Sequence, residues 1–115
     1  MTARSEALVA TDRPARYGKQ LVAHLGRRNG GEWSDSDERG FIAFNAGRAE
    51  LSCEPGGLRL AVEADPDVLA QLEDVVGRHL VRFGTRDELH VAWSRADGAP
   101  GTEQQGSDEQ HDSAE

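Results

Sequence analysis

The chain contains few residues of several kinds that would place it in a definite class. Its 115 residues include one cysteine, Cys53, so no disulfide can form within the chain, and we expect a reducing compartment. Aromatic residues make up 5% of the sequence, which requires a core built mainly from aliphatic side chains. No apolar run approaches the roughly 20 residues of a membrane-spanning helix, and residues 1–6 lead into no export signal. We therefore expect a soluble, cytoplasmic protein without a membrane partner.

Basic residues are missing from the last twenty positions of the chain. All 13 Lys and Arg residues lie in residues 1–95 together with 15 of the 21 acidic residues, which leaves that part with a formal charge of −2. Residues 96–115 carry the other six acids and no large apolar side chain. Such a segment cannot offset its ordering entropy by burial, so we predict a disordered acidic tail whose removal leaves the melting temperature unchanged. The nearly neutral remainder argues against a nucleic-acid binder, which needs a basic surface.

The hydropathy pattern of residues 1–95 predicts a single domain that contains both helices and strands. Alternating apolar and polar residues predict strands over residues 3–10, 40–46, 48–54, 58–64 and 88–93. Apolar residues at helical spacing predict a first helix, with Asp12 as its cap, Pro14 in its first turn and Gly26 at its end. They predict a second helix over residues 66–83, which Gly84 ends.

These elements give an α+β fold with the order β-α-β-β-β-α-β. The simplest arrangement has two layers, with two helices packed on one face of a four- to five-stranded, mostly antiparallel sheet. Residues 29–40 are rich in turn-forming residues, and a short extra strand near Trp33 would be the fifth strand. The strands that alternate in polarity leave the other face of the sheet polar and open to water.

Two stretches of the sequence carry a resemblance to a known family. One is Ala-Thr-Asp-Arg-Pro-Ala-Arg-Tyr-Gly-Lys-Gln-Leu over residues 10–21. The other is Leu-Glu-Asp-Val-Val-Gly-Arg-His-Leu-Val-Arg-Phe-Gly-Thr-Arg-Asp-Glu-Leu over residues 72–89, followed by the strand that holds Trp93. Over about residues 3–95 the chain resembles the small bacterial family catalogued as domain of unknown function 2218. The resemblance implies a bacterial, cytoplasmic protein with a link to iron–siderophore handling, and it transfers no catalytic residues.

Two histidines are the first candidates for a functional site. His24 and His79 each lie seven positions after one apolar residue of their helix and three after another, so both should flank the face that packs on the sheet. One interpretation is a pocket formed with Glu73 or Asp74 that binds a metal ion or ligand, or moves protons. The other is a pair of boundary histidines that hydrogen-bond to the backbone or to nearby acids. No ligand spacing typical of metal sites is present, and we expect no cofactor.

The second helix also carries a row of arginines. Arg78 and Arg82 lie four positions apart, and Arg78 lies four positions after Asp74. The spacing predicts a solvated ladder of ion pairs. The alternative is an anion site in which Arg86 joins Arg78 and Arg82, although a helix C-terminus disfavours anions.

Three further residues have a side chain that could take part in function. Trp33 lies in a polar loop, where it would either contact a ligand or cover one end of the core. Cys53 alternates with inward-facing apolar residues, which favours a buried, inert thiol. His90 alternates with two apolar residues and should lie on the solvated face of the last strand.

Two hypotheses about function remain. The first is a non-enzymatic binding or accessory module that assembles through the edge or the polar face of its sheet, with a protein partner or a second copy of the chain. The second is a small enzyme or a metal- or ligand-binding protein that uses His24 and His79. We favour the first, because the sequence offers no complete set of nucleophile, base and stabilising group.

Overall fold

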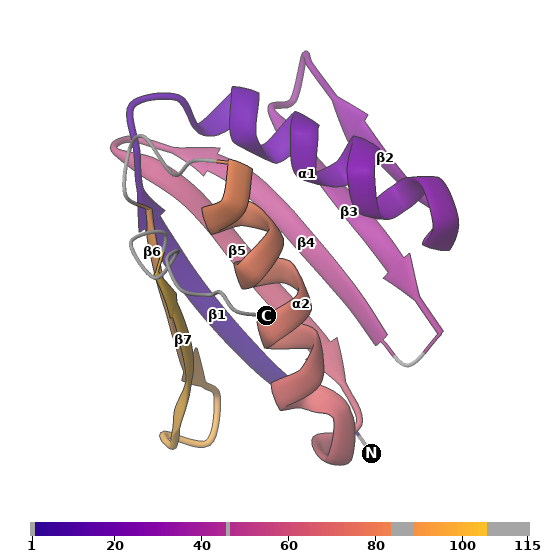
Figure 1. Ribbon diagram of the computed structural model, residues 1–115, viewed down its shortest axis with the longest axis vertical. Helices are drawn as coiled ribbons and strands as arrows, with labels where there is room; N and C mark the ends of the chain where they lie inside the picture. The colour runs from indigo at the N-terminus through magenta and orange to yellow at the C-terminus, as the bar shows by residue number, and fades with distance from the viewer. Residues whose placement is uncertain (1, 46, 84–88, 106–115) are drawn as a thin grey trace.

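The protein is described by a computed structural model over residues 2–45, 47–83 and 89–105, and it has two helices packed on one face of an antiparallel sheet (Figure 1). In chain order its elements are β1 (Ala3–Ala10), α1 (Pro14–Asn29), β2 (Gly31–Ser34), β3 (Arg39–Phe44), β4 (Gly47–Glu54), β5 (Gly57–Ala64), α2 (Pro66–Phe83), β6 (His90–Arg95) and β7 (Pro100–Gln105). The two predicted layers are confirmed.

The first strand of the chain lies in the middle of the sheet. The strand order is β2-β3-β4-β5-β1-β6-β7, and all neighbouring strands in the described part of the chain are antiparallel. β1 pairs along its whole length with β5, from Ala3 opposite Ala64 to Ala10 opposite Gly57. Its other edge pairs with β6, where Ser5 lies opposite Arg95. The β1–β6 pairing brings the C-terminal hairpin beside the N-terminal strand.

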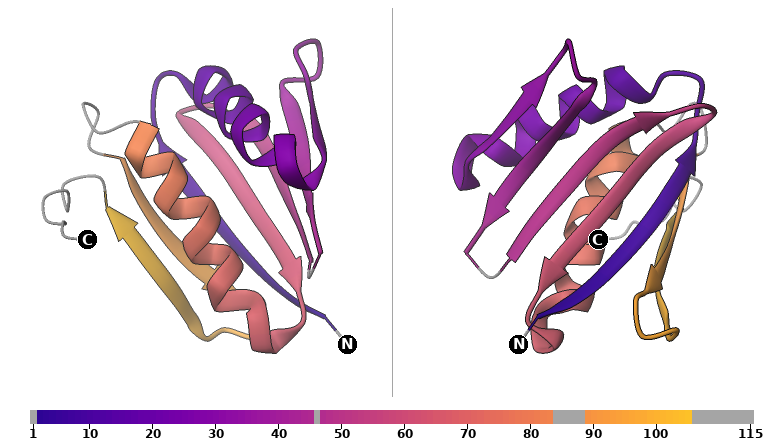
Figure 2. Two further views of the ribbon diagram at one scale, coloured as in Figure 1. Left: turned by 45° about the vertical axis from the view of Figure 1, so that its right-hand side comes forward. Right: turned by 180° about the vertical axis from the view of Figure 1, so that it is seen from behind.

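The two faces of the sheet differ in character. We call the face that carries the helices the inner face and the opposite face the outer face. Leu58, Leu60 and Val62 of β5 point to the inner face and are at most 1% exposed. Arg59 and Glu63, at alternate positions of the same strand, point to the outer face, which the helices leave uncovered (Figure 2, right). The period of two that was read from the sequence for residues 58–64 is therefore confirmed.

Each helix covers one half of the inner face. α1 packs mainly on β2, β3 and β4, whereas α2 packs on β5, β1, β6 and β7, as both views in Figure 2 show. Their buried apolar residues, which fill the core against the sheet, include Tyr17, Leu21 and Leu25 of α1 and Leu69, Val76 and Leu80 of α2. Within the described residues, neither helix is long and apolar enough to cross a membrane.

The first helix is capped and ended differently from the prediction. Arg13 occupies the N-cap position, and no side chain makes a cap hydrogen bond there, so the assignment of this role to Asp12 was wrong. Pro14 does open the helix, as predicted. The helix also continues past Gly26, because the carbonyl of Gly26 accepts a hydrogen bond of 2.7 Å from the amide of Gly30. Gly30, with a φ of 100°, provides the left-handed conformation that ends the helix.

The predicted strand over residues 3–10 and the predicted helix over residues 66–83 are confirmed to the residue. The sheet, however, has seven strands rather than four or five. The short strand expected near Trp33 is β2, which forms a hairpin with β3. The last predicted strand, 88–93, lies at His90–Arg95 instead, and position 88 is outside the described residues.

The seventh strand corrects the prediction that residues 96–115 form a disordered tail. Residues 100–105 form β7, which pairs with β6 and packs against α2. Gln104 is 7% exposed, so this strand is buried through polar side chains, a possibility that a search for apolar residues does not detect. Residues 106–115 lie outside the described residues.

Candidate functional site

His24 and His79 lie side by side between α1 and α2. Their ring centroids are 5.2 Å apart, and the ring planes are inclined by 41°. The His24 ring also meets the Phe83 ring edge-on, with centroids 5.5 Å apart. His24 is exposed and His79 is half-buried. The structure therefore places next to each other the two histidines that one interpretation of the sequence assigned to a shared pocket.

The hydrogen bond of His79 fixes which of its ring nitrogens carries a proton. Nδ1 of His79 lies 2.7 Å from the main-chain oxygen of Val75, one turn earlier in α2. A carbonyl oxygen can only accept, so Nδ1 is the donor. In the neutral ring Nε2 then holds the lone pair, which makes it available as a base or as a metal ligand.

The two carboxylates that were considered as partners of these histidines are engaged elsewhere. Asp74 forms an ion pair of 3.2 Å with Arg78, one turn further along α2. Glu73 faces the sheet and binds Arg95 and Thr102. Among the described residues, neither histidine makes a hydrogen bond to a carboxylate.

One of the ion pairs that the sequence predicts along α2, between Asp74 and Arg78, is present in the structure. The Asp74–Arg78 pair joins two half-exposed side chains, and such pairs contribute a few tenths of a kcal/mol. Arg82 is exposed in the last turn of the helix. Arg86, the third member of the alternative anion site, lies outside the described residues.

Trp33 covers one end of the core from β2. Its indole ring is half-buried and lies against Gly18 of α1 and Gly40 of β3, where an added Cβ would come within 2.8 Å of ring atoms. Its Nε1 donates to Asp35 at 3.1 Å. These contacts favour the role of a cover over the core, one of the two roles that the sequence left open.

Cys53 points to the inner face near the end of β4 and is half-buried, so it is less enclosed than predicted. Burial and the nearby carboxylate of Glu38 raise the pKa of its thiol. A raised pKa reduces the thiolate fraction at neutral pH, which fits the expectation of an inert side chain.

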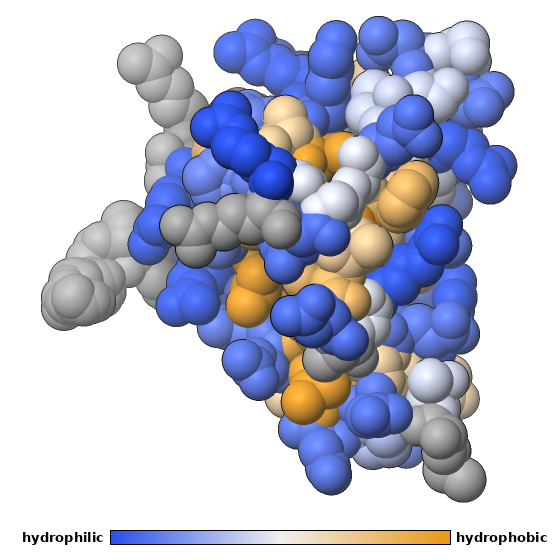
Figure 3. Space-filling model, turned by 90° about the vertical axis from the view of Figure 1, so that its right-hand side faces the viewer, coloured by the Kyte–Doolittle hydropathy of each residue, from blue (hydrophilic) through white to orange (hydrophobic). Residues whose placement is uncertain are grey.

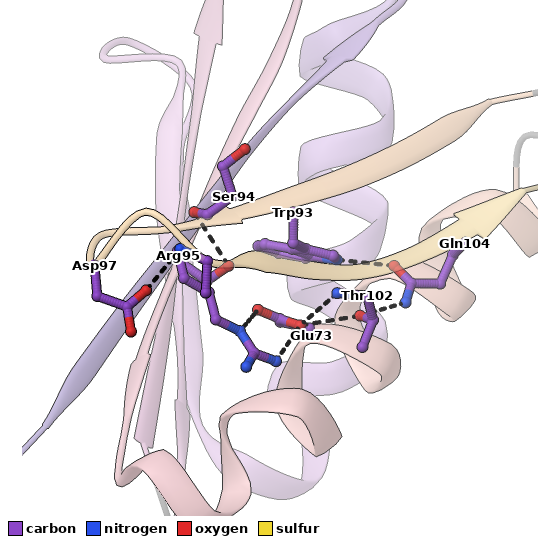
Figure 4. Close-up of polar contacts among 9 residues, drawn as sticks. Glu73, Trp93, Ser94, Arg95, Asp97, Thr102 and Gln104 are labelled. Atoms are coloured by element: carbon purple, nitrogen blue, oxygen red, sulfur yellow. Dashed lines mark hydrogen bonds and ion pairs between the residues drawn. The ribbon is translucent and has the colours of Figure 1, made fainter.

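A buried polar cluster joins α2 to the C-terminal hairpin (Figure 4). Glu73 is 0% exposed, yet its carboxylate accepts a hydrogen bond from each of two Arg95 nitrogens, both at 3.2 Å. The amide and the hydroxyl of Thr102 each donate to Glu73 Oε1 at 3.0 Å. Next to it, Trp93 Nε1 donates to Gln104 Oε1 at 2.8 Å. Every polar group of this cluster named here thus has a partner, as buried polar groups require.

The cluster keeps Glu73 ionised. Burial alone would raise the pKa of Glu73, but hydrogen bonds from Arg95, Ser5 and Thr102 together lower it below the ordinary carboxyl value. Ser5 is itself 0% exposed, and its hydroxyl donates to the main-chain oxygen of Ser94 at 3.4 Å. The result is a charged ion pair, with its carboxylate fully buried and its guanidinium partly exposed, that ties helix to sheet.

Two glycines make room for this cluster. A Cβ at Gly77 of α2 would lie 1.9 Å from Gln104 Oε1, and a Cβ at Gly101 would lie 2.8 Å from Glu73 Oε2. The polar side chains of β7 and α2 therefore fit only because these positions have no side chain. The cluster is a structural clamp between α2 and the C-terminal hairpin.

The outer face of the sheet is hollowed over several strands. A hollow of about 690 Å³ lies over β2, β3, β4 and β5. Its charged lining consists of four arginines (Arg4, Arg39, Arg48 and Arg59) and three acids (Glu32, Asp37 and Glu50). The sequence predicted a solvated face here but did not single out these residues, although their period-two spacing along the strands was the available signal.

Most charges on the outer face are held by partners. Arg59 donates to Glu54 at 3.1 Å, and this bond lowers the pKa of Glu54. Arg59 also donates to Glu6 at 3.2 Å. Arg48 pairs with Glu50 at 3.4 Å, and its guanidinium lies 4.4 Å from the centre of the Phe41 ring. The outer face thus carries a network of alternating charges, in which ion pairs hold most of the side chains in place.

Arg39 differs from the other arginines of the hollow. It is exposed at the start of β3, and it has no ion pair with any acid in the described part of the chain. The outer face also exposes one large apolar side chain. Leu8 of β1, which lies opposite Arg59 of β5, is 50% exposed. On a different side, shown in Figure 3, apolar residues form a strip with hydrophilic borders.

Comparisons with known proteins identify relatives but no established activity. A family model described as an uncharacterized protein conserved in bacteria (DUF2218) matches residues 6–94. The chain is similar to the NMR structure of PA4090 from Pseudomonas aeruginosa, with 34% identity, a TM-score of 0.64, and coverage of 80% of this chain and 95% of that one. No curated protein gives a significant match. The resemblance read from the sequence is confirmed, and β7 follows the segment that the family model matches.

Proposed function

We propose that this chain, which belongs to the bacterial family DUF2218, is a non-enzymatic binding module that holds a protein partner on the outer face of its sheet. The observation that carries the proposal is the hollow of about 690 Å³ on a sheet face that neither α1 nor α2 covers. A surface of this size that stays open beside a well-packed core is a natural docking area.

The charges of the outer face favour a protein over other partners. Arginines and acids alternate across the hollow, with four of one sign and three of the other, so the face has no uniform potential to attract a nucleic acid. A protein surface carries both signs and can match such a pattern residue by residue. Arg39 is available for an acidic group of the partner, and Phe41 offers the kind of aromatic contact that is enriched in interfaces.

Site-specific photo-crosslinking in the host bacterium tests this proposal. A photoreactive phenylalanine analogue at position 41 reports on the outer face, and the same analogue at Gln71, exposed on α2, is the matched control. We expect a discrete protein adduct from position 41 and none from position 71. Arg39→Glu should reduce the adduct about fivefold or more, whereas Arg13→Glu at the start of α1 should not change it.

Three outcomes would contradict the proposal. They are no adduct from position 41, equal adducts from positions 41 and 71, or an adduct that Arg39→Glu leaves unchanged. The connection to iron–siderophore handling that the resemblance implies stays a prediction, and the identity of the captured protein decides it.

The second hypothesis, a site built on His24 and His79, keeps one supporting observation. The two rings are 5.2 Å apart, but the carboxylate that an acid–base pair would need is engaged with other residues. The geometry therefore favours ligand binding by the histidines over catalysis.

A further inference from the structure

We propose that His24 and His79 together bind one divalent transition-metal ion, such as Zn²⁺, Cu²⁺ or Ni²⁺, between α1 and α2. This site lies on the helix layer and is independent of the partner surface on the outer face. It uses two of the four histidines of the chain.

The spacing of the two rings suits a shared metal ion. Imidazole nitrogens bind Zn²⁺ at about 2.0–2.1 Å, so two imidazoles on one tetrahedral ion have their ring centroids roughly 5 Å apart. The observed centroid distance is 5.2 Å. The rings are tilted by 41° rather than stacked in parallel, as two ligands of one ion can be.

The protonation of His79 also suits a ligand. Its Nδ1 donates to the main-chain oxygen of Val75 at 2.7 Å, which leaves the Nε2 lone pair free in the neutral ring. A ligand histidine in a metal site commonly donates its other nitrogen to a carbonyl in this way, and the bond fixes both the tautomer and the ring orientation. The main chain of α2 thus provides the supporting hydrogen bond before any ion is bound.

The surroundings hold His24 in place without closing the site. The edge of the Phe83 ring contacts the His24 ring, and both histidines project from helices that are anchored by buried leucines. His24 is exposed, so an ion can reach the pair from solvent. Rigid helices with an exposed ligand pair favour a preformed site over one that must fold around its ion.

The type and number of ligands among the described residues limit which metal ions this site can bind. They contain no group of three or more histidine, cysteine, aspartate or glutamate side chains arranged around one point, so the proposed site has the two imidazoles as its protein ligands. Imidazole ligands select zinc, copper and nickel and bind the oxygen-preferring ions Mg²⁺ and Ca²⁺ poorly. The site is therefore an open, exchangeable one.

Calorimetric titration of the untagged full-length chain with Zn²⁺, and separately with Ni²⁺, tests the proposal. We expect one site per chain, with affinity reduced about tenfold or more in His24→Gln and in His79→Gln. His90→Gln and His111→Gln are matched controls that should bind as the wild type does. Mg²⁺ should give no saturable binding. Equal affinity in the double variant His24→Gln/His79→Gln, or a loss caused by His90→Gln or His111→Gln, would overturn the proposal.

A second measurement on the unsubstituted protein guards against an unfolded variant. In imidazole nitrogen NMR spectra, sub-stoichiometric Zn²⁺ should shift the ring nitrogens of His24 and His79 together. The signals of the two other histidines should stay in place. Shifts confined to the other histidines, or no shift of any ring, would contradict a shared site.

Discussion

Glu73 of α2 and Arg95 of β6 form a bidentate ion pair, with both nitrogen–oxygen distances at 3.2 Å, although Glu73 is 0% exposed. The Arg95 side chain remains 27% exposed, so the pair extends from the interior to the surface. Thr102 of β7 binds the same carboxylate, which makes Glu73 the point where the helix, β6 and β7 are joined. Stability should therefore depend on this one carboxylate.

Replacement of Glu73 by glutamine should destabilise the domain by about 1–3 kcal/mol. The glutamine amide keeps the shape of the side chain but turns a donor toward the guanidinium of Arg95, which leaves buried donors unpaired. Urea unfolding of wild type and Glu73→Gln measures the difference. Glu103→Gln, an exposed carboxylate on β7, is the control and should change stability by less than about 0.5 kcal/mol. Equal effects of the two substitutions would contradict the clamp.

The stability that Glu73 contributes should be lost in acid. Its pKa is lower in the folded state than in the unfolded state, so the unfolded state binds more protons in the pH range between the two values. The contribution is complete above the ordinary carboxyl pKa of about 4.3 and disappears as pH falls through the folded-state value. The stability difference between wild type and Glu73→Gln should therefore shrink from about pH 6 to about pH 3. A difference that stays constant over this range would contradict an ionised Glu73.

Gly77→Ala should destabilise the protein although alanine is the better helix former by about 1 kcal/mol. Its Cβ would lie 1.9 Å from Gln104 Oε1, so Gln104 must move and give up its bond from Trp93. In a Gln104→Ala background the same substitution should be neutral or stabilising. A double-mutant cycle measured by chemical denaturation checks this coupling. Additive effects would show that the close approach of helix and strand does not matter.

Removal of β7 should cost much more than the sequence suggested. A chain that ends at Gln105 is the reference, and a chain that ends at Arg95 lacks the strand that binds Glu73. We expect the shorter chain to melt roughly 10 °C lower or more, because about 1 kcal/mol corresponds to about 4–8 °C in a domain of this size. Differential scanning calorimetry of the two chains gives the comparison. Equal melting temperatures would restore the earlier expectation that this segment is dispensable.

The sequence predicts best those elements that are apolar on one side. α2 was predicted to the residue, because its Pro66 start and its apolar stripe indicate the same limits. Gly84, which was expected to end this helix, lies outside the described residues. β7 was missed because it packs through a half-buried Thr102 and a buried Gln104, whose hydrogen bonds with Glu73 and Trp93 replace apolar contact. α1 was predicted too short because a glycine can stay within a helix when the hydrogen-bond ladder continues.

The candidate sites were predictable to different degrees. The sequence placed His24 and His79 beside the packing faces of two helices, but their proximity depends on how the two helices lie on the sheet. The clamp was not foreseen, yet Glu73 lies four positions after Leu69 and three before Val76, which places it on the apolar stripe of α2. A carboxylate at such a position indicates a buried partner, but its identity, Arg95, depends on how the chain folds. The hollow on the outer face depends on the twist and the pairing of four strands and cannot be read from one strand.

The partner surface is tested most directly by NMR with the protein that position 41 captures. Addition of that purified protein to the isotope-labelled domain should perturb backbone amides of β3, β4 and β5 at outer-face positions, including Arg39, Phe41 and Arg48. Amides along α1 and α2 should remain unchanged. Perturbations confined to the helices, with the outer face unaffected, would contradict the account.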